Sequence, residues 1–261
     1  MMYEFCTQTH AGLLRENNED AVAFDAPSGV AVLADGMGGY NAGEVASSMA
    51  TAFIQTELGR WLLDAGLQAN GKEVRRAMDI CVHNANLAVF TAANTHDEYI
   101  GMGTTLVVGV FQDSRVLVGH IGDSRCYRFR DKSLVQITKD HSLLQEQLDA
   151  GLITPAQAAV STNKNLVTRA LGIEDAVMLE VHEHTVEEGD VYLMCSDGLS
   201  DMVDDVPIAR IMETDAPLEQ KARQLISIAN AHGGRDNITV LLAHAVAGIP
   251  KRGLMSRLLG N

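Results

Sequence analysis

The sequence predicts an α+β fold in which antiparallel sheets are layered and helices cover their outer faces. Apolar runs with strand-like alternation occur in neighbouring pairs, and two helical segments joined by a short link follow the first of these pairs. A third helical segment precedes the last strand. Because strands and helices do not alternate regularly, a parallel sheet built from βαβ units is disfavoured.

The expected strands are rich in Val, Ile and Leu. They cover residues 3–9, 21–25, 30–34, 104–111, 115–121, 124–129, 177–186, 190–195 and 238–245. Apolar side chains recur at helical intervals in three further segments, which are 42–58, 71–93 and 217–231. The first two of these are close in sequence, and we expect them to pack as an antiparallel pair.

The chain has no internal repeat and no low-complexity linker, which predicts one domain over residues 1–247. A polar stretch at about 140–172 contains short helix-forming pieces separated by glycine and proline, and we expect it to be a flap inserted into that domain. Residues 248–261 follow the last expected strand and are basic, and we expect a loosely docked tail.

The composition restricts the class of protein. A hydrophobic share of 46% is enough for a sizeable core, so a monomer is the default expectation. The net charge of −14 offers no cationic surface to a phosphate backbone, which disfavours nucleic-acid binding. The four cysteines are widely spaced and predict reduced thiols in the cytoplasm. No apolar run is long enough for a membrane span, and the first residues do not resemble a signal peptide.

Five aspartates stand at the ends of expected apolar strands: Asp20, Asp35, Asp123, Asp197 and Asp236. Carboxylates at the tips of core strands are partly desolvated, and a group of them is unfavourable unless a cation or strong hydrogen bonds compensate the charge. A single aspartate beside a glycine is most often a turn residue. Five together are better explained by a shared all-oxygen site of the kind that suits Mg²⁺ or Mn²⁺.

Seven short motifs follow one another along the chain. They are RENNED (15–20), DGMGG (35–39), GTT (103–105), GDSR (122–125), TRALG (168–172), SDGL (196–199) and GRDN (234–237). Each is common in turns, but in this order they make nearly the whole chain resemble the metal-dependent serine/threonine protein phosphatases of the protein phosphatase 2C family, in particular its stand-alone bacterial members. The resemblance implies a four-layer α-β-β-α sandwich of two antiparallel sheets flanked by helix pairs, with a metal site in a cleft at one edge.

The resemblance also implies which residues hold two Mn²⁺ or Mg²⁺ ions. Asp35 would bridge the two ions and is expected to be essential for catalysis. The carbonyl group of Gly36 would help to hold the second ion. Asp197 and Asp236 would complete the ligands of the first ion.

The remaining implied roles fall on the first and fourth motifs. Glu19 and Asp20 would serve the second ion, directly or through water. Bacterial members often bind a third, weaker ion, for which Asp123 together with Asp197 is the candidate pair. Arg15 matches the arginine that grips the substrate phosphate, and its planar guanidinium can contact two phosphate oxygens at once.

The implied function is hydrolysis of phosphoserine and phosphothreonine in proteins by a metal-activated water, in a single in-line displacement. Two cations roughly 3.5–4 Å apart would neutralise the phosphate oxygens and lower the pKa of the attacking water. The implied partners are phosphorylated proteins, and the enzyme would oppose a bacterial serine/threonine kinase. Met37 stands where eukaryotic members commonly have a histidine that can protonate the leaving group, and a thioether cannot donate a proton.

Two alternatives differ in mechanism. A catalytically silent relative that binds phosphoproteins as a scaffold is expected to lack metal aspartates, and none of the five is missing here. A thiol phosphatase needs an arginine six residues after its nucleophilic cysteine, and none of the four cysteines has one. His182 and His184 are expected to be neighbours on a strand surface rather than metal ligands, and His141 is expected to be structural.

Overall fold

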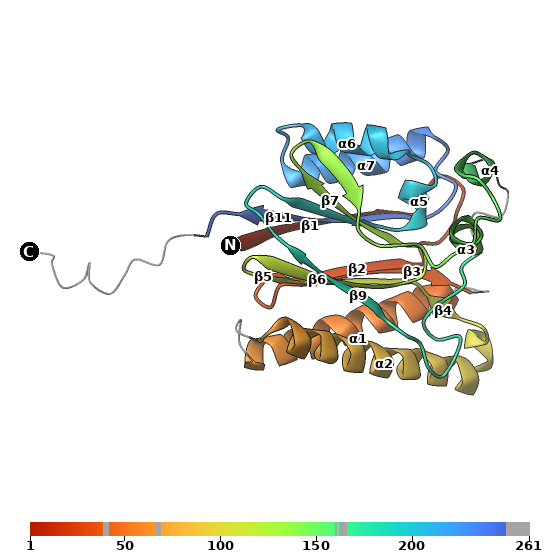
Figure 1. Ribbon diagram of the computed structural model, residues 1–261. Helices are drawn as coiled ribbons and strands as arrows, with labels where there is room; N and C mark the ends of the chain where they lie inside the picture. The colour runs from red at the N-terminus through yellow and green to blue at the C-terminus, as the bar shows by residue number, and fades with distance from the viewer. Residues whose placement is uncertain (39–41, 66–68, 160, 162–165, 249–261) are drawn as a thin grey trace, which may run out of the picture.

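The computed structural model describes residues 1–38, 42–65, 69–159, 161 and 166–248. Gly39 of the DGMGG motif, a part of the expected flap and nearly all of the expected tail lie outside the described residues. Figure 1 shows four layers, in which two sheets face each other and helices cover both outer faces. This arrangement confirms the predicted α-β-β-α sandwich.

The strands form two antiparallel sheets, one with the order β1-β11-β10-β7-β8 and the other with the order β2-β3-β5-β6-β9, where β4 pairs with β3. The bounds of the first sheet are β1 (Met2–His10), β11 (Ile238–Val246), β10 (Val191–Cys195), β7 (Arg125–Arg130) and β8 (Ser133–Gln136). The bounds of the second are β2 (Asp20–Asp25), β3 (Val30–Met37), β4 (Gly103–Thr104), β5 (Leu106–Gln112), β6 (Arg115–Ile121) and β9 (Glu180–Thr185).

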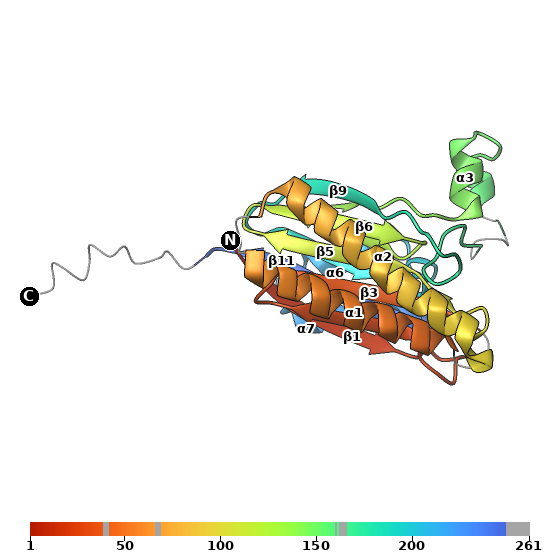
Figure 2. The same cartoon turned by 90° about the horizontal axis from the view of Figure 1, so that it is seen from below.

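Helices α1 (Ala42–Ala65) and α2 (Gly71–Thr95) lie side by side across the second sheet, as Figure 2 shows. Asn70 starts α2, because its side chain accepts the backbone N–H groups of Lys72 and Glu73 while the Glu73 carboxylate accepts the N–H of Asn70. Helices α6 (Asp205–Glu213) and α7 (Leu218–Ala231) cover the first sheet.

Four short helices complete the described chain: η1 (Asp97–Tyr99), α3 (Leu143–Asp149), α4 (Pro155–Ala159) and α5 (Asp197–Ser200). Helices α3 and α4 belong to the expected flap and project beyond the sheets. The pattern analysis missed α6 and the edge strand β8 and ended α1 seven residues early. The nine residues of α6 bury only Ile208 and Met212, which is too few to establish a period.

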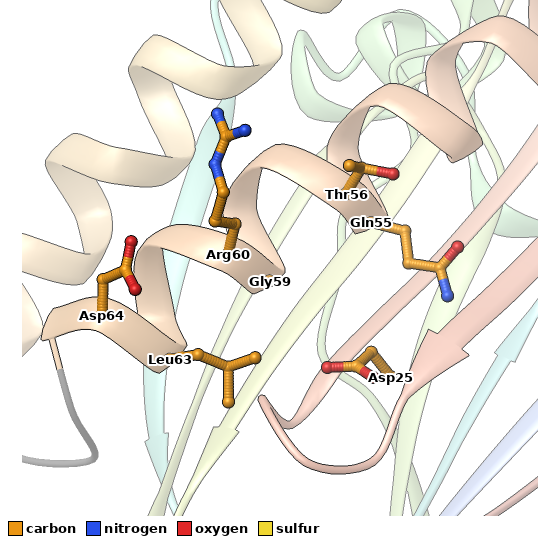
Figure 3. Close-up of a pocket in the computed structure, with 7 residues that line it drawn as sticks. All are labelled: Asp25, Gln55, Thr56, Gly59, Arg60, Leu63 and Asp64. Carbon is orange, nitrogen blue, oxygen red and sulfur yellow. The ribbon is translucent and has the colours of Figure 1, made fainter.

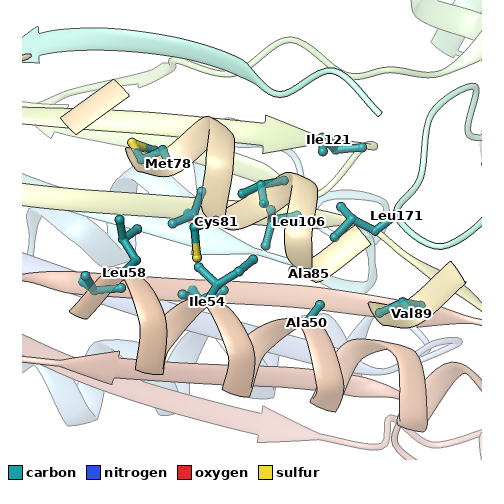
Figure 4. Packing of buried hydrophobic residues seen from close by; sticks show 14 of the residues in the cluster. Ala50, Ile54, Leu58, Met78, Cys81, Ala85, Val89, Leu106, Ile121 and Leu171 are labelled. Atoms are coloured by element: carbon teal, nitrogen blue, oxygen red, sulfur yellow. The ribbon is translucent and has the colours of Figure 1, made fainter. Parts of the chain in front are cut away.

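Each of the three interfaces between layers has its own apolar core. Between the helix pair and the second sheet, Ile54, Leu58 and Met78 pack against Leu106 and their neighbours (Figure 4). A second core lies between the two sheets, where Tyr192 is completely buried, and a third lies under α6 and α7. These cores fix both sheets rigidly, so the loops at their ends have defined positions.

None of the helices in the described ranges is long and apolar enough to cross a membrane.

Candidate metal centre

Two of the predicted aspartates face each other across neighbouring strands. The antiparallel register of β2 and β3 places Asp20 directly opposite Asp35, where side chains on paired strands lie close together. The backbone around Asp35 is fixed by two threonines: its N–H donates to Thr105 Oγ1 at 3.0 Å, and Thr104 Oγ1 donates to its carbonyl oxygen at 2.9 Å. The Thr105 hydroxyl is in turn bonded to the Ser124 hydroxyl at 2.8 Å.

The opposite sheet contributes two more carboxylates from adjacent strands. Asp197 is the first residue of α5, directly after β10, and Asp236 lies just before β11, which pairs with β10. A Cβ atom at Gly198 would lie 1.9 Å from the carbonyl oxygen of Asn237, so only glycine lets α5 approach the start of β11 this closely. This contact holds the SDGL and GRDN motifs together.

Asp123 lies in the turn between β6 and β7, and only 8% of it is exposed. Burial raises its pKa to about 6, with a further contribution from the charge of Asp140. Asp123, Asp197 and Asp201 line one side of a cavity of about 250 Å³, while flap residues including Leu144 line the other. The expected flap therefore forms one wall of the site.

The carboxylates of this group raise one another's pKa values. Burial raises the pKa of Asp35 well above its usual range, and the negative charges of neighbouring aspartates raise it further. Those neighbours are Asp20, Asp197, Asp123 and Asp236. The pKa of Asp197 is also raised well above its usual range, first by burial and then by the charge of Asp123. The five aspartates predicted from the sequence are therefore brought to one place.

Asp20 has the clearest unmet need for a ligand. Ser196 Oγ donates to its Oδ2 at 2.8 Å, and the N–H of Thr239 donates to that hydroxyl at 3.0 Å. Its Oδ1 atom is buried and has no hydrogen-bond partner within the part of the chain that the structure describes. Burial raises the pKa of Asp20 to about 6, because the hydrogen bond from Ser196 offsets only a part of the desolvation.

Glu19 and Gly36 lie beside this group. The Glu19 carbonyl accepts the N–H of Gly36 at 3.1 Å and the hydroxyl of Ser47 at 2.6 Å. Its carboxyl group lies against Gly43, where a Cβ would come within 2.9 Å of it. Burial raises the pKa of Glu19. Gly36 packs so tightly that a Cβ would lie 2.1 Å from the Gly43 carbonyl oxygen, which brings its backbone close to the acidic group.

Arg15 lies on the rim of the group and is about half exposed. Its Nη2 atom donates to Oδ2 of Asp236 at 2.7 Å. The side chain of Asp236 is 31% accessible, so this ion pair lies within reach of solvent. Arg15 is thus placed at the mouth of the site with its donors directed towards the carboxylates.

Asn237 holds the loop that carries Arg15 and Glu19, and the sequence analysis did not identify this role. Its Oδ1 accepts the N–H of Glu19 at 2.7 Å, and its Nδ2 donates to the carbonyl oxygens of Ala11 at 3.1 Å and Asn17 at 2.8 Å. Its own N–H donates to Asp236 at 2.9 Å. The only sequence signal was its place after Asp236 in the GRDN motif.

The residues present fit a pair of hard divalent cations. All the side-chain atoms that could bind a metal here are carboxylate oxygens, and one of them, Oδ1 of Asp20, is buried without a hydrogen-bond partner in the described residues. The repulsion between the carboxylates, which raises the pKa values of Asp35 and Asp197, would be relieved by positive charge. Within the described residues, none of Asp20, Asp35 and Asp197 makes an ion pair with a basic side chain.

A second group of possible metal ligands consists of His120, His141 and Glu180, whose ligand atoms lie within 4.8 Å of one another. Its hydrogen bonds argue against a metal. His141 Nδ1 accepts the N–H of Gly122 at 3.2 Å, so the proton of the neutral ring belongs on Nε2, which lies 3.2 Å from Glu180. Hydrogen bonds from His182 and His141 lower the pKa of Glu180 to about 2. The group connects the start of the flap to β9.

A cavity of about 420 Å³ lies at the far end of α1, beside Asp25, Gln55 and Arg60 (Figure 3). Asp25 ends the strand that Asp20 begins, so this cavity is at the opposite end of β2 from the carboxylate group. Its charged residues are Asp25, Asp64 and the basic Arg60, so this cavity does not gather carboxylates alone as the acidic site does.

Comparison with known proteins agrees with this architecture. Residues 12–243 match the family described as Protein phosphatase 2C. The chain is 35% identical over 238 residues to the serine/threonine phosphatase stp of Listeria monocytogenes, which covers 90% of this chain and 93% of that protein. The chain belongs to the protein phosphatase 2C family.

Two solved structures are similar throughout. The crystal structure of the Mycobacterium tuberculosis serine/threonine phosphatase PstP/Ppp has a TM-score of 0.85 and 36% identity, covering 95% of this chain and 100% of that chain. The catalytic domain of PstP in complex with two manganese ions has a TM-score of 0.83 and 36% identity, covering 94% of this chain and 99% of that chain.

Proposed function

We propose that this protein is a metal-dependent protein phosphatase that hydrolyses phosphoserine and phosphothreonine. The observation that carries the proposal is the convergence of Asp20, Asp35 and Asp197, which are half-buried among other carboxylates and have no basic partner within the described residues. Such a group is stable only as protonated acids or with bound cations. Membership of the protein phosphatase 2C family and the two manganese ions in the PstP complex favour bound cations over protonated acids.

Two Mn²⁺ or Mg²⁺ ions would share Asp35. Asp197 and Asp236 are proposed to complete the ligands of the first ion, and the Gly36 carbonyl group with Glu19 and Asp20 would hold the second, directly or through water. These are the residues that the strand register and the Asn237 contacts bring together. Asp123 and Asp197, which share the cavity beneath the flap, are proposed to hold a third, weaker ion. When bound, the ions would supply Lewis-acid activation of water and neutralise the phosphate oxygens.

The chain's own groups bind and orient the substrate. Arg15 is proposed to exchange its contact with Asp236 for two oxygens of the phosphate, because a guanidinium can serve both as a planar donor. The hydrogen bonds of Asn237 keep the Arg15 loop in register with Asp236. Met37 cannot protonate the departing serine or threonine oxygen, so that proton must come from another donor.

A silent phosphoprotein-binding relative is the alternative. It would have no use for buried carboxylates without partners, since they lower stability unless a cation binds. The full set of Asp20, Asp35, Asp197 and Asp236 therefore favours the enzyme.

We also propose finer assignments. Residues 1–247 would act as one phosphatase domain, with 248–261 as a tail, and the protein would act as a monomer opposing a serine/threonine kinase. A cytoplasmic location is supported by four free, buried cysteines, because secreted proteins tend to pair theirs.

The test is turnover of p-nitrophenyl phosphate and of a phosphothreonine peptide by the purified chain. We expect phosphate release with added Mn²⁺, full loss of it with EDTA, and recovery when Mn²⁺ is restored in excess. Activity that survives chelation would contradict the metal-dependent mechanism, and no turnover with any divalent ion would favour the silent relative.

A further inference from the structure

Two large apolar side chains stand in water directly beside the proposed phosphate arginine. Leu13 is 62% exposed and Leu14 is 71% exposed, and they immediately precede Arg15. Single exposed leucines are ordinary on protein surfaces. A consecutive pair at the rim of a site whose other side chains are mainly carboxylates is less ordinary, and it needs an explanation in terms of what it contacts.

The loop that carries the two leucines is held from several sides. The N–H of Leu13 donates to the carbonyl oxygen of Gly234 at 2.7 Å. Asn237 donates to Ala11 on one side of the pair and to Asn17 on the other. The loop is therefore fixed to the segment that leads into β11.

Gly12 makes this close attachment possible. Its φ of +80° is in the left-handed region, and a Cβ at this position would lie 2.2 Å from the carbonyl oxygen of Asp236. The two leucines thus belong to a preorganised surface whose position relative to Asp236 is set by the backbone. An apolar ligand that contacts them does not have to order the loop first.

The position of the pair defines which part of a substrate reaches it. Consecutive Cα atoms of a protein chain are about 3.8 Å apart, so Leu13 and Leu14 lie close to Arg15 along the backbone. A bound peptide in extended form advances about 3.3–3.6 Å per residue. If Arg15 holds the phosphate, the peptide residues that can reach the two leucines are those within about three positions of the phosphorylated residue.

We propose that Leu13 and Leu14 select phosphoprotein substrates by binding an apolar side chain that lies within three residues of the phosphoserine or phosphothreonine. The inference rests on the proposed function and assigns the substrate class of that same site. The charge of the protein excludes one class of flanking residue, since a net charge of −14 and a rim of carboxylates repel acidic side chains. Apolar contact supplies affinity that does not depend on charge.

The test uses phosphothreonine peptides in which one residue at a time, from three positions before the phosphothreonine to three after it, is Leu, Gln or Glu. We expect the parent protein to prefer Leu at one or more positions by roughly tenfold in kcat/KM, mostly through KM, which is a typical effect of burying part of one apolar side chain. The variants are Leu13→Ser, Leu14→Ser and the double variant, in which the preference should fall to less than about twofold.

Two controls separate this inference from the proposed function. Val206→Ser changes a residue on α6 that is also highly exposed, at 61%, and should leave the peptide preference intact. Hydrolysis of p-nitrophenyl phosphate, which has no flanking residues, should be the same in all variants. If the parent protein fails to hydrolyse this ester with Mn²⁺, the proposed function itself is wrong.

The inference is overturned if the parent protein hydrolyses all the peptides equally, or if the double variant keeps the preference for Leu. It is also overturned if light scattering shows that the leucine substitutions only dissolve a dimer, because the pair would then be a contact between two copies of the chain.

Discussion

Strand β10 has an aspartate at each end, and the two have opposite surroundings. Asp190, just before the strand, is 1% exposed, and the Arg130 guanidinium donates to both of its carboxylate oxygens at 2.6 Å. The N–H of Glu187 adds a third bond at 2.9 Å. Asp197, two residues after the strand, is half-buried, and its partial burial and the negative charges of neighbouring carboxylates raise its pKa.

The difference separates a structural carboxylate from one that is kept for a ligand. Asp190 has its counter-ion within the fold, so its burial is already compensated. Asp197, Asp35 and Asp20 lack such a partner in the described chain, so their mutual repulsion is not compensated within the fold, and a bound cation would relieve it. The presence of a basic partner at Asp190 and its absence at Asp197, within the described residues, distinguishes the two ends of β10.

The largest effect is expected for Asp35→Asn. Removing the carboxylate shared by the proposed ions should lower kcat on the order of a thousandfold. The same change should raise the Tm of the metal-free protein, because it removes one of the repelling charges. Turnover with excess Mn²⁺ and calorimetry in EDTA measure the two effects. Equal activity in the variant and the parent would remove Asp35 from the site.

Asp190→Asn is the matched change at the other end of β10. It should destabilise the fold by about 1–3 kcal/mol, because the buried Asp190 loses the charge-assisted bonds from Arg130, although Arg130 keeps its contact with Glu187. Urea unfolding with and without Mn²⁺ checks this, and the loss should be the same in both conditions. The kcat of the folded variant should stay close to that of the parent. A stability loss that Mn²⁺ abolishes would mean that Asp190 also takes part in metal binding.

The metal-free protein should become less stable as the pH rises from 5 to 7. The pKa values of Asp20 and Asp123 are raised from 3.8 to about 6, so their stabilising contribution is full below about pH 4 and is lost as the pH rises through 6. Divalent ions replace the protons and reverse this trend. The gap in Tm between samples with Mn²⁺ and samples with EDTA should therefore widen towards pH 7, and a constant gap would contradict the assignment.

The smallest effect is expected for Arg15→Ala. The loss of the guanidinium should raise KM for phosphopeptides by roughly tenfold and change kcat less, because the phosphate contact contributes mainly to binding. Since Arg15 also neutralises Asp236 in the described structure, the variant should bind Mn²⁺ at least as tightly as the parent in titration calorimetry. Arg15→Lys is the control, as it keeps the charge but loses the planar pair of donors. Weaker Mn²⁺ binding by the alanine variant would contradict this view of the Arg15–Asp236 contact.

The pattern of apolar residues predicted most of the strands and the three long helices, because each of them buries a regular face. Composition and periodicity indicated antiparallel layers, while the four-layer sandwich followed from the resemblance to a family. The edge strand β8 and the short helix α6 escaped prediction, because Val135 of β8 is exposed and α6 buries only Ile208 and Met212.

The five candidate aspartates could be chosen from the sequence because they stand at the ends of expected strands, and the resemblance to a family assigned their roles. Their supports could not. The links that Asn237 makes to Ala11 and Asn17 span more than 200 positions of the chain, and no local pattern predicts such contacts. The pairing of Asp190 with Arg130 joins residues 60 positions apart, so the comparison between the two ends of β10 also depends on the folded structure.

The most direct test of the account is anomalous diffraction from crystals of the protein grown with Mn²⁺ at neutral pH. We predict two strong manganese peaks bridged by Asp35, one of them next to Asp197 and Asp236, and none beside Asp190. Manganese peaks elsewhere on the molecule, with Asp20, Asp35 and Asp197 bonded only to protein groups and water, would contradict the claim that these buried carboxylates exist to hold cations.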